Sequence, residues 1–209
     1  MEDTTAKNEY EHVARLVESM DAIPNLTNQD KMNILLVFKG LKPATILEFV
    51  APAHDEHANI EIAEYVQGLC ELLQSQNFLV HKDCEDENAN SGEEGFARDF
   101  NHYSVYTAKT PENLSMLVES DTEEDRKTKD YKRGKVLGYP DTAIHAWIDG
   151  NILKDVQELP EDVRDSGVLK FVNFRLSRDH WRDELEQVSN EALTVKEMSP
   201  ALYDDILNG

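Results

Sequence analysis

Cysteine is scarce in this chain, which contains only Cys70 and Cys84 among 209 residues. The two form no CxxC pair and no disulfide framework. Cys70 lies in an apolar stretch, and a free cysteine packs like a small hydrophobic residue, so we expect it in a buried helix. Cys84 is flanked by Asp83 and Glu85, whose carboxylates disfavour a thiolate. The sequence therefore argues against a nucleophilic cysteine.

Long apolar runs are also absent, and no stretch approaches the length that crosses a bilayer. The first residues, MEDTTAKNEYEH, hold neither an apolar core nor a cleavage signal. We therefore expect a soluble, cytoplasmic protein with no membrane partner.

Familiar catalytic signatures are missing as well. The chain has no P-loop, no GxGxxG after a strand, no GxSxG and no HExxH. The SRDH stretch at 177–180 contains serine, aspartate and histidine, but neighbours in sequence cannot adopt the relay geometry of a catalytic triad. No motif therefore defines an enzyme, and the cofactor is unknown from the sequence.

Basic residues are few relative to acidic ones. The chain has 42 Asp and Glu against 21 Lys and Arg, which gives a net charge of −21 and an isoelectric point near 4.6. Such a charge repels nucleic acid and anionic lipid unless a local basic patch overrides it. Adaptation to a high-salt cytoplasm and ordinary acidic solubility both explain it. We favour the halophilic interpretation, although 13 Lys against 8 Arg count against it.

The N-terminal part is predicted to contain two helices. Residues 8–21 have apolar residues at helical spacing. A second helix begins after Thr27, which serves as N-cap with Asp30 three residues on, in the pattern of a capping box. Gly40 is expected to end this helix in the left-handed conformation.

Strand patterns follow at 44–50, 77–82 and 102–109, and residues 58–76 form an amphipathic helix between the first two. A strand–helix–strand unit normally joins parallel strands by a right-handed crossover. We therefore expect the strands at 44–50 and 77–82 to be parallel.

From residue 111 onward the chain is predicted to be mainly helical, with a fourth strand at 168–176. There is no internal repeat and no linker rich in Pro or Ser. The predicted fold is a single α/β domain over 1–209, with a small, three- to four-stranded, partly parallel sheet and helical extensions at both ends. Its parts are a helical segment at 8–40, an α/β core at 44–109 and a mainly helical part at 111–207.

The acidic stretch 83–95 has some features of a calcium loop. Asp86, Asn88 and Asn90 have the spacing of the first three ligands of an EF-hand. The required glycine is Ser91, however, and the bidentate glutamate is Ala97. We therefore favour a solvated polar loop.

Three histidines are candidate metal ligands or acid–base groups. His54 and His57 follow the first strand together with Asp55, and His81 is the third candidate. Two imidazoles three residues apart, with a further donor, can hold Zn²⁺ or Fe²⁺. The alternative is a polar loop with incidental histidines.

A local cluster of bases contrasts with the acidic chain. Positions 126–135 hold Arg126, Lys127, Lys129, Lys132, Arg133 and Lys135, and a second basic segment adds Arg175, Arg178 and Arg182. These side chains are candidates for binding a nucleotide, a phosphate or an RNA backbone. The alternative is local charge pairing, because acidic residues lie just upstream at 123–125.

The stretch that follows, Gly138-Tyr139-Pro140, has the features of a joint between two helices. Gly138 is expected to end one helix in the left-handed conformation, and Pro140 to begin the next. A helix N-terminus beside bases also offers free backbone N–H groups to an anion. Gly138 and Tyr139 are therefore candidate ligand-binding residues.

Residues 134–147, GKVLGYPDTAIHAW, resemble a motif of an archaeal family catalogued as domain of unknown function 483. That motif reads roughly G-[KR]-L-L-G-Y-P-x-C-C-[VI]-x-x-[FW], and the matching residues are Gly134, Lys135, Leu137, Gly138, Tyr139, Pro140, Ile144 and Trp147. The Cys-Cys pair of the motif is replaced by Thr142-Ala143, which argues against thiolate metal chemistry at this position. The resemblance implies an archaeal origin and an α/β fold. It implies no activity, because the family has no established one.

Three functions remain open from the sequence. The favoured one is a non-catalytic binding or regulatory protein that recognises an anionic ligand at the basic patch. The second is an enzyme that acts on a small molecule through His54, His57 or His81, with or without a metal. The third is a protein–protein interaction module, in which the partner is another chain or a second copy.

Overall fold

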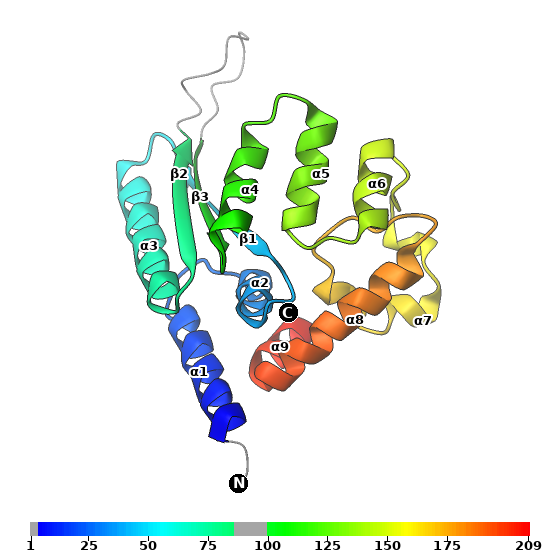
Figure 1. Cartoon of the computed structure of the whole chain (residues 1–209), viewed down its shortest axis with the longest axis horizontal. Coiled ribbons are helices and arrows are strands. Elements are labelled where there is room, and N and C mark those ends of the chain that lie inside the picture. Colours follow the sequence, from blue (N-terminus) through cyan, green and yellow to red (C-terminus); the bar gives the residue numbers. More distant parts are fainter. Residues whose placement is uncertain (1–3, 86–99) are drawn as a thin grey trace.

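The computed structural model describes residues 4–85 and 100–209, in which helices surround a small sheet (Figure 1). The calcium-loop positions Asp86, Asn88 and Asn90 lie outside this part of the chain. The described elements are, in order, α1 (Thr4–Asp21), α2 (Asn28–Lys39), β1 (Ala44–Pro52), α3 (Glu56–Ser75), β2 (Leu79–Glu85), β3 (Phe100–Ala108), α4 (Pro111–Asp121), α5 (Arg126–Val136), α6 (Asp141–Asp149), the 3₁₀ helix η2 (Val156–Glu158), α7 (Glu161–Arg164), the 3₁₀ helix η3 (Val168–Phe171), α8 (Trp181–Met198) and α9 (Pro200–Asn208).

Helix α2 begins and ends as predicted. The Thr27 hydroxyl accepts a hydrogen bond from the Asp30 backbone N–H at 3.1 Å, and the Asp30 carboxylate accepts one from the Thr27 N–H at 3.0 Å. This reciprocal pair is a capping box, which satisfies two backbone donors at the helix start. Gly40 ends the helix with φ at +78°, a conformation that glycine adopts at little cost.

The sheet has the strand order β1–β3–β2, and β3 is antiparallel to both neighbours. Tyr106 of β3 lies between Ile46 of β1 and His81 of β2. Strands β1 and β2 therefore run in the same direction, but they do not pair with each other. The prediction of a partly parallel sheet is wrong, because the strand–helix–strand pattern sets the direction of two strands and not which later strand inserts between them. The coarser prediction of an α/β protein is confirmed.

The predicted strand at 168–176 is also wrong. Its first residues form η3, and Phe171 is buried and stacks on Tyr203 of α9 with ring centroids 5.1 Å apart. Within the described residues, strand pairing near this run is limited to one isolated antiparallel bridge, between Ile152 and Ser177. A short apolar run fits a buried 3₁₀ turn as well as a strand, so periodicity alone does not separate them.

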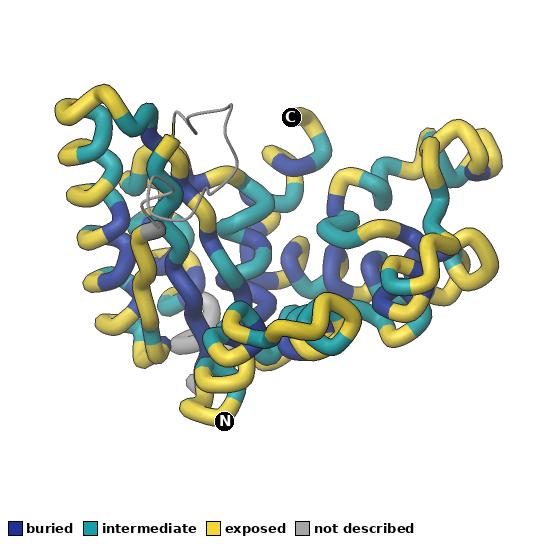
Figure 2. The backbone as a smooth tube through the Cα atoms, turned by 90° about the horizontal axis from the view of Figure 1, so that it is seen from above, coloured by how far each residue is buried: buried dark blue, intermediate teal, exposed yellow. Residues whose placement is uncertain are grey.

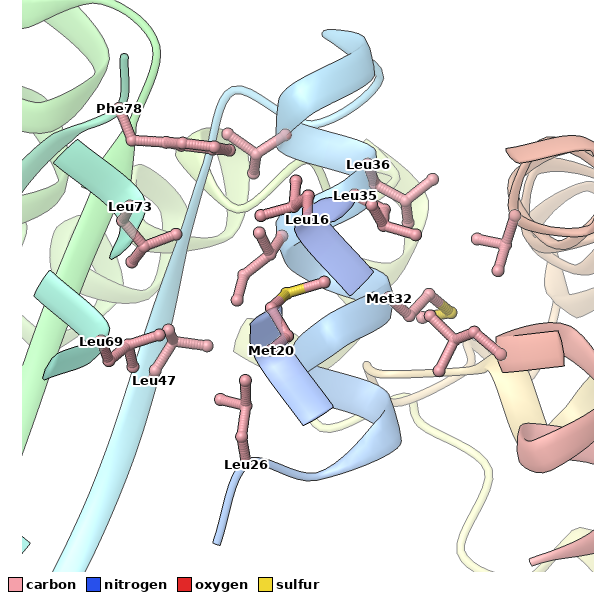
Figure 3. Packing of buried hydrophobic residues seen from close by; sticks show 14 of the residues in the cluster. Leu16, Met20, Leu26, Met32, Leu35, Leu36, Leu47, Leu69, Leu73 and Phe78 are labelled. Atoms are coloured by element: carbon pink, nitrogen blue, oxygen red, sulfur yellow. The ribbon is translucent and has the colours of Figure 1, made fainter. Parts of the chain in front are cut away.

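Helix α2 runs through the main hydrophobic core and is surrounded on most sides. Figure 3 shows Leu16 and Met20 of α1, Leu47 of β1 and Leu69 of α3 gathered around it. Burying one such side chain stabilises the fold by about 1.5–3 kcal/mol. The buried residues of α2 itself are Met32, Ile34, Leu35, Leu36 and Val37.

Alternation along β1 divides the interior into two cores, and the buried residues are shown in dark blue in Figure 2. Leu47 and Phe49 belong to the core formed with α2 and α3. Ala44 and Ile46 point to the opposite face, where they pack with Leu117 of α4. Side chains at even-numbered positions of β1 are therefore directed toward α4 and α5.

The C-terminal part is docked onto the rest of the chain. Val188 and Val195 of α8 belong to the same core as α2, while Leu159, Leu176 and Leu185 form a smaller cluster of their own. The single-domain organisation over 1–209 stays a prediction. Within the described residues, no helix combines the length and the apolar character required to cross a membrane.

Candidate functional site

A cavity of about 500 Å³ lies beside β1, on the side of this strand that faces away from β2. Its size falls within the range of small-molecule sites. Its walls come from α2, β1, α5, α6 and the segment 173–175. We call it the β1-edge pocket and define it by Gln29, Asn33, Lys42, Thr45, Ile46, Glu48, Asp130, Arg133, Gly134, Leu137, Tyr139, Ala143, Ile144, Trp147, Asn173, Phe174 and Arg175.

Lys42 is placed in the pocket by the end of α2. After the left-handed turn at Gly40, the backbone N–H groups of Leu41 and Lys42 both donate to the carbonyl of Leu36, at 2.9 and 3.2 Å. This arrangement closes the helix, and it leaves Leu41 exposed while Lys42 turns inward. Lys42 is only 3% exposed, and its burial lowers the pKa from 10.5 to about 8, with the charge of Glu191 opposing part of the shift.

An amide cluster holds the Lys42 ammonium group. The side-chain carbonyl of Asn33 accepts hydrogen bonds from Lys42 Nζ at 3.0 Å and from the Asn173 amide at 2.6 Å. Lys42 and Asn173, which lie 131 positions apart in the sequence, thereby share one acceptor. A neutral acceptor satisfies a donor of Lys42 without compensating its charge, which is why burial dominates the pKa.

Tyr139 and Gly138 complete this wall. Gly138 has φ at +75° and ends α5, and the Tyr139 N–H donates to the Gly134 carbonyl at 3.0 Å, so the predicted helix joint is confirmed. The Lys42 Nζ lies 5.5 Å from the centre of the Tyr139 ring, which also packs on Phe174 at 5.5 Å. Burial raises the pKa of the Tyr139 hydroxyl. The phenol is therefore neutral at physiological pH.

Arg133 also lines the pocket, but its charge is already compensated. One guanidinium nitrogen donates to the Asp121 carboxylate at 2.9 Å, and the other lies 3.5 Å from Glu48. Two carboxylates beside one guanidinium leave little net positive charge for a ligand. Arg133 therefore links α5 to α4 and β1 rather than offering a free cation.

Arg175 and Gln29 present donors that the protein leaves unused. The Arg175 guanidinium lines the pocket and forms no hydrogen bond or ion pair with any residue in 4–85 or 100–209. The amide nitrogen of Gln29 is buried and has no hydrogen-bond acceptor in the same part of the chain. Buried polar groups are nearly always paired, so an unpaired amide in a pocket indicates a place for an acceptor atom.

The other predicted bases of α5 do not reach the pocket. Lys132 forms an ion pair with Glu123, and Lys135 lies 2.8 Å from Asp141. The hydrogen bond to Asp141 raises the pKa of Lys135. Local charge pairing, the alternative drawn from the sequence, accounts for both residues.

In the second basic segment, Arg178 and Arg182 also lie away from the pocket. Arg178 forms an ion pair with Glu158 at 3.2 Å, and Arg182 stacks over the Trp181 ring at 4.2 Å. Neither lines the β1-edge pocket. Of the eight predicted ligand-binding residues, Arg133, Tyr139 and Arg175 converge on this pocket, and Gly138 supports it from behind.

Two carboxylate side chains of the protein itself lie at the start of α6. Asp141 occupies its first turn, and the Thr142 hydroxyl donates to Glu184 at 2.7 Å. Glu184 is 1% exposed and also accepts from the Ser177 backbone N–H at 2.7 Å. With two carboxylates beside it, this helix start does not favour a further anion. Thr142 therefore contributes a structural hydrogen bond at the position of the first cysteine of the motif.

The candidate metal ligands do not meet. Asp55 is the N-cap of α3 and accepts from the Ala58 N–H at 3.0 Å, and His54 and His57 flank it at the exposed helix start. His81 lies in β2 level with Ile46, six residues before the end of β1. That separation corresponds to about 20 Å along the sheet.

No cluster in the described part of the chain replaces this histidine set. Within residues 4–85 and 100–209, no three His, Cys, Asp or Glu side chains lie close enough to hold a metal ion. His81 instead packs beside the Tyr106 ring at 5.7 Å. The described histidines therefore offer no shared centre for the predicted enzyme.

Sequence reasoning missed Lys42, Gln29, Asn33 and Asn173. The first three lie within fourteen residues of one another, and Asn173 follows only after most of the chain. Isolated amides carry no recognisable pattern, and Lys42 is inconspicuous between Leu41 and a proline. The available signal was the left-handed end of α2 at Gly40, which determines where the following lysine points.

Comparison with protein-family models, with curated proteins and with solved structures gave no match. The resemblance of residues 134–147 to the archaeal family therefore stays a prediction based on the motif alone.

Proposed function

We propose that this protein binds a small organic anion in the β1-edge pocket, and that this binding is its primary function. The observation that carries the proposal is a set of hydrogen-bond donors in one cavity that no carboxylate of the described residues accepts from. Arg175 supplies a guanidinium and Gln29 a buried amide, both without an acceptor in 4–85 and 100–209, and Lys42 supplies an ammonium whose hydrogen-bond acceptor is a neutral oxygen. A carboxylate or phosphate would satisfy all three donor types.

The pocket favours a small molecule over a polyanion. An RNA backbone needs a row of uncompensated cations along an open surface, because binding comes from the release of many counterions. Here Lys132, Lys135 and Arg178 are each paired with a carboxylate, and the chain carries a net charge of −21. A single anionic group at Arg175 avoids most of this repulsion.

Aromatic and apolar side chains on the same walls define the rest of the ligand. Tyr139, Phe174 and Trp147 line the pocket together with Ile46 and Ile144. Flat or apolar groups bury well against such surfaces. The expected ligand therefore combines an anionic group with a ring or short carbon skeleton, which includes mononucleotides and small phosphorylated or carboxylated metabolites.

Calorimetry and thermal shift with a panel of small anions test the proposal. The panel contains inorganic phosphate, adenosine monophosphate, pyridoxine 5′-phosphate and 2-oxoglutarate, at a fixed salt concentration because salt screens exposed charges. A ligand that binds the folded state raises the melting temperature by an amount that grows with the logarithm of its concentration over Kd. We expect at least one organic anion to do so, and inorganic phosphate to bind more weakly.

The matched variants are Arg175→Gln and Arg178→Gln, which remove the same charge three residues apart. Only the first residue lines the pocket, and the second is paired with Glu158. A charge-assisted pair contributes about 1.5–3 kcal/mol, so Arg175→Gln should weaken binding about 10- to 100-fold, with Arg178→Gln unchanged. Equal losses in the two variants, or no binding across the panel, would overturn the proposal.

A further inference from the structure

Lys42 is the one lysine of residues 11–85 and 100–209 that is buried, and its hydrogen-bond acceptor is not a carboxylate. Lys31, Lys129, Lys132 and Lys135 each lie within 4 Å of a carboxylate, whereas the hydrogen-bond acceptor of Lys42 is the neutral amide oxygen of Asn33. Lys42 is also 3% exposed, and it lines the β1-edge pocket. Its terminal nitrogen is therefore shielded from bulk water and adjacent to a space that a ligand can fill.

Burial in this position lowers the pKa of Lys42, so that part of its amine is uncharged near neutral pH. With a pKa of about 8, about a quarter of Lys42 is uncharged at pH 7.5, whereas a solvent-exposed lysine is almost fully protonated. Only the uncharged amine is a nucleophile. The charged groups around this site are Glu191 of α8, Glu48 of β1, Asp130 and Arg133 of α5 and Arg175.

We propose that Lys42 forms a reversible imine with a carbonyl compound whose anionic group is bound by Arg175. The inference rests on the proposed function, because it requires the pocket to hold an organic anion. It narrows the ligand class to aldehydes, 2-oxo acids and phosphorylated carbonyl compounds.

The reaction needs no co-reactant. The Lys42 Nζ attacks the carbonyl carbon, and a C–N bond forms as the carbonyl π bond opens. The two N–H hydrogens of the amine then leave with the carbonyl oxygen as one molecule of water, and a C=N double bond remains. Asn33 acts as a positioning residue, since its oxygen holds Nζ while Asn173 fixes the orientation of the Asn33 amide.

The probes are pyridoxal 5′-phosphate and glyoxylate, two anionic aldehydes of different size. The full chain is incubated with substoichiometric probe at pH 7.5 and reduced with borohydride, and the modified lysines are identified by peptide mass spectrometry. We expect modification of Lys42 to exceed that of any other lysine by at least tenfold. Lys42→Arg keeps the charge and should abolish this adduct, while Arg175→Gln should reduce it about tenfold.

Lys109 is the internal control. Burial also lowers its pKa, but it packs over the Phe38 and Phe78 rings and is not part of the β1-edge pocket. If basicity alone governed modification, Lys109 would be modified together with Lys42. Preference for Lys42 over Lys109 supports a role for the pocket, and equal modification of the two overturns the inference.

Pyridoxine 5′-phosphate and glycolate, which carry a hydroxyl in place of the aldehyde, separate the two proposals. If they bind and Arg175→Gln weakens that binding, but neither aldehyde is trapped on Lys42, the pocket binds anions and the imine is wrong. If no anion in the panel or among these probes binds, the proposed function fails. Trapping at Lys42 that exceeds trapping at Lys109 and that Arg175→Gln reduces supports both.

Discussion

Gly138 lies directly against Lys42: a Cβ atom at position 138 would sit 3.2 Å from the Lys42 Cγ and 3.2 Å from the Pro43 Cδ. The turn that ends α5 is therefore packed on the turn that follows α2. This contact joins two segments almost one hundred residues apart and sets the back wall of the β1-edge pocket. Glycine is required at position 138 for two reasons. The backbone has a positive φ there, and Lys42 and Pro43 leave little room for a Cβ atom.

Gly138→Ala should destabilise the protein more than Gly150→Ala. Both glycines end helices with almost the same positive φ, so both substitutions carry a conformational cost of about 1–2 kcal/mol. Position 150 has no atom within 4 Å of the added Cβ, whereas position 138 adds the tight contacts to Lys42 and Pro43. We expect a further loss of about 1 kcal/mol at position 138, measured by urea denaturation. Equal losses would show that the close approach has no energetic consequence.

The pH dependence of stability should report the buried Lys42. Its pKa is lowered on folding from 10.5 to about 8, so the unfolded chain binds more protons than the folded one between these values. Stability attributable to Lys42 therefore rises with pH across this window, by up to about 3 kcal/mol, and is lowest below pH 8.

The measurement compares the wild type with Lys42→Met, which keeps the volume of the side chain but does not titrate. Urea unfolding at a series of pH values gives the difference between their unfolding free energies, from which titrations common to both proteins cancel. We expect this difference to shift in favour of the wild type from pH 8 to 10.5. A difference independent of pH would show that Lys42 titrates normally.

Thr142→Val should cost more than Thr128→Val. Each threonine hydroxyl donates to a carboxylate at 2.7 Å, to Glu184 in the first case and to Asp125 in the second. Glu184 is buried, so losing a donor leaves a poorly solvated carboxylate and should cost about 1–3 kcal/mol. The Asp125 carboxylate is exposed to water, and we expect a loss below about 0.5 kcal/mol. Thermal and urea denaturation of both variants give the comparison, and a larger loss for Thr128→Val would contradict it.

The acidic composition predicts stabilisation by salt. A net charge of −21 destabilises the compact state through self-repulsion, and the screening length falls from about 10 Å at 0.1 M to about 3 Å at 1 M salt. We expect the melting temperature to rise over this range of potassium chloride and to level off above it. An unchanged melting temperature would contradict the halophilic interpretation, while a continuing linear rise would indicate ion exclusion instead of screening.

Local chemistry allowed much of the fold to be predicted, because caps and breakers act within a few residues. Thr27, Gly40 and Gly138 mark the helix ends that the structure contains. Strand pairing was not predictable in the same way, since β1 and β2 each satisfy their pattern whichever strand lies between them. The prediction of a strand at 168–176 was wrong because its apolar residues pack against α8 and α9 instead of against a neighbouring strand.

The candidate site was predicted only where a signal was local. Arg133, Tyr139 and Arg175 stood out as bases or as part of the helix joint, and they do line one pocket. The density of positive charge suggested a broader patch, but charge pairing with nearby acids depends on side-chain positions that the sequence does not give. Lys42 and Asn33 meet because α2 packs where it does, which is a property of the fold as a whole.

The insertion of β3 between β1 and β2 has a consequence for synthesis on the ribosome. Neither of the first two strands can form its ladder until Phe100–Ala108 has been made, so half of the chain emerges with its strand edges unpaired. Sheet formation must then close contacts between distant residues, such as Ala44 and Ala108, which slows folding relative to a local hairpin. The helices can form early, and the late arrival of β3 sets the order in which the nascent protein acquires its structure.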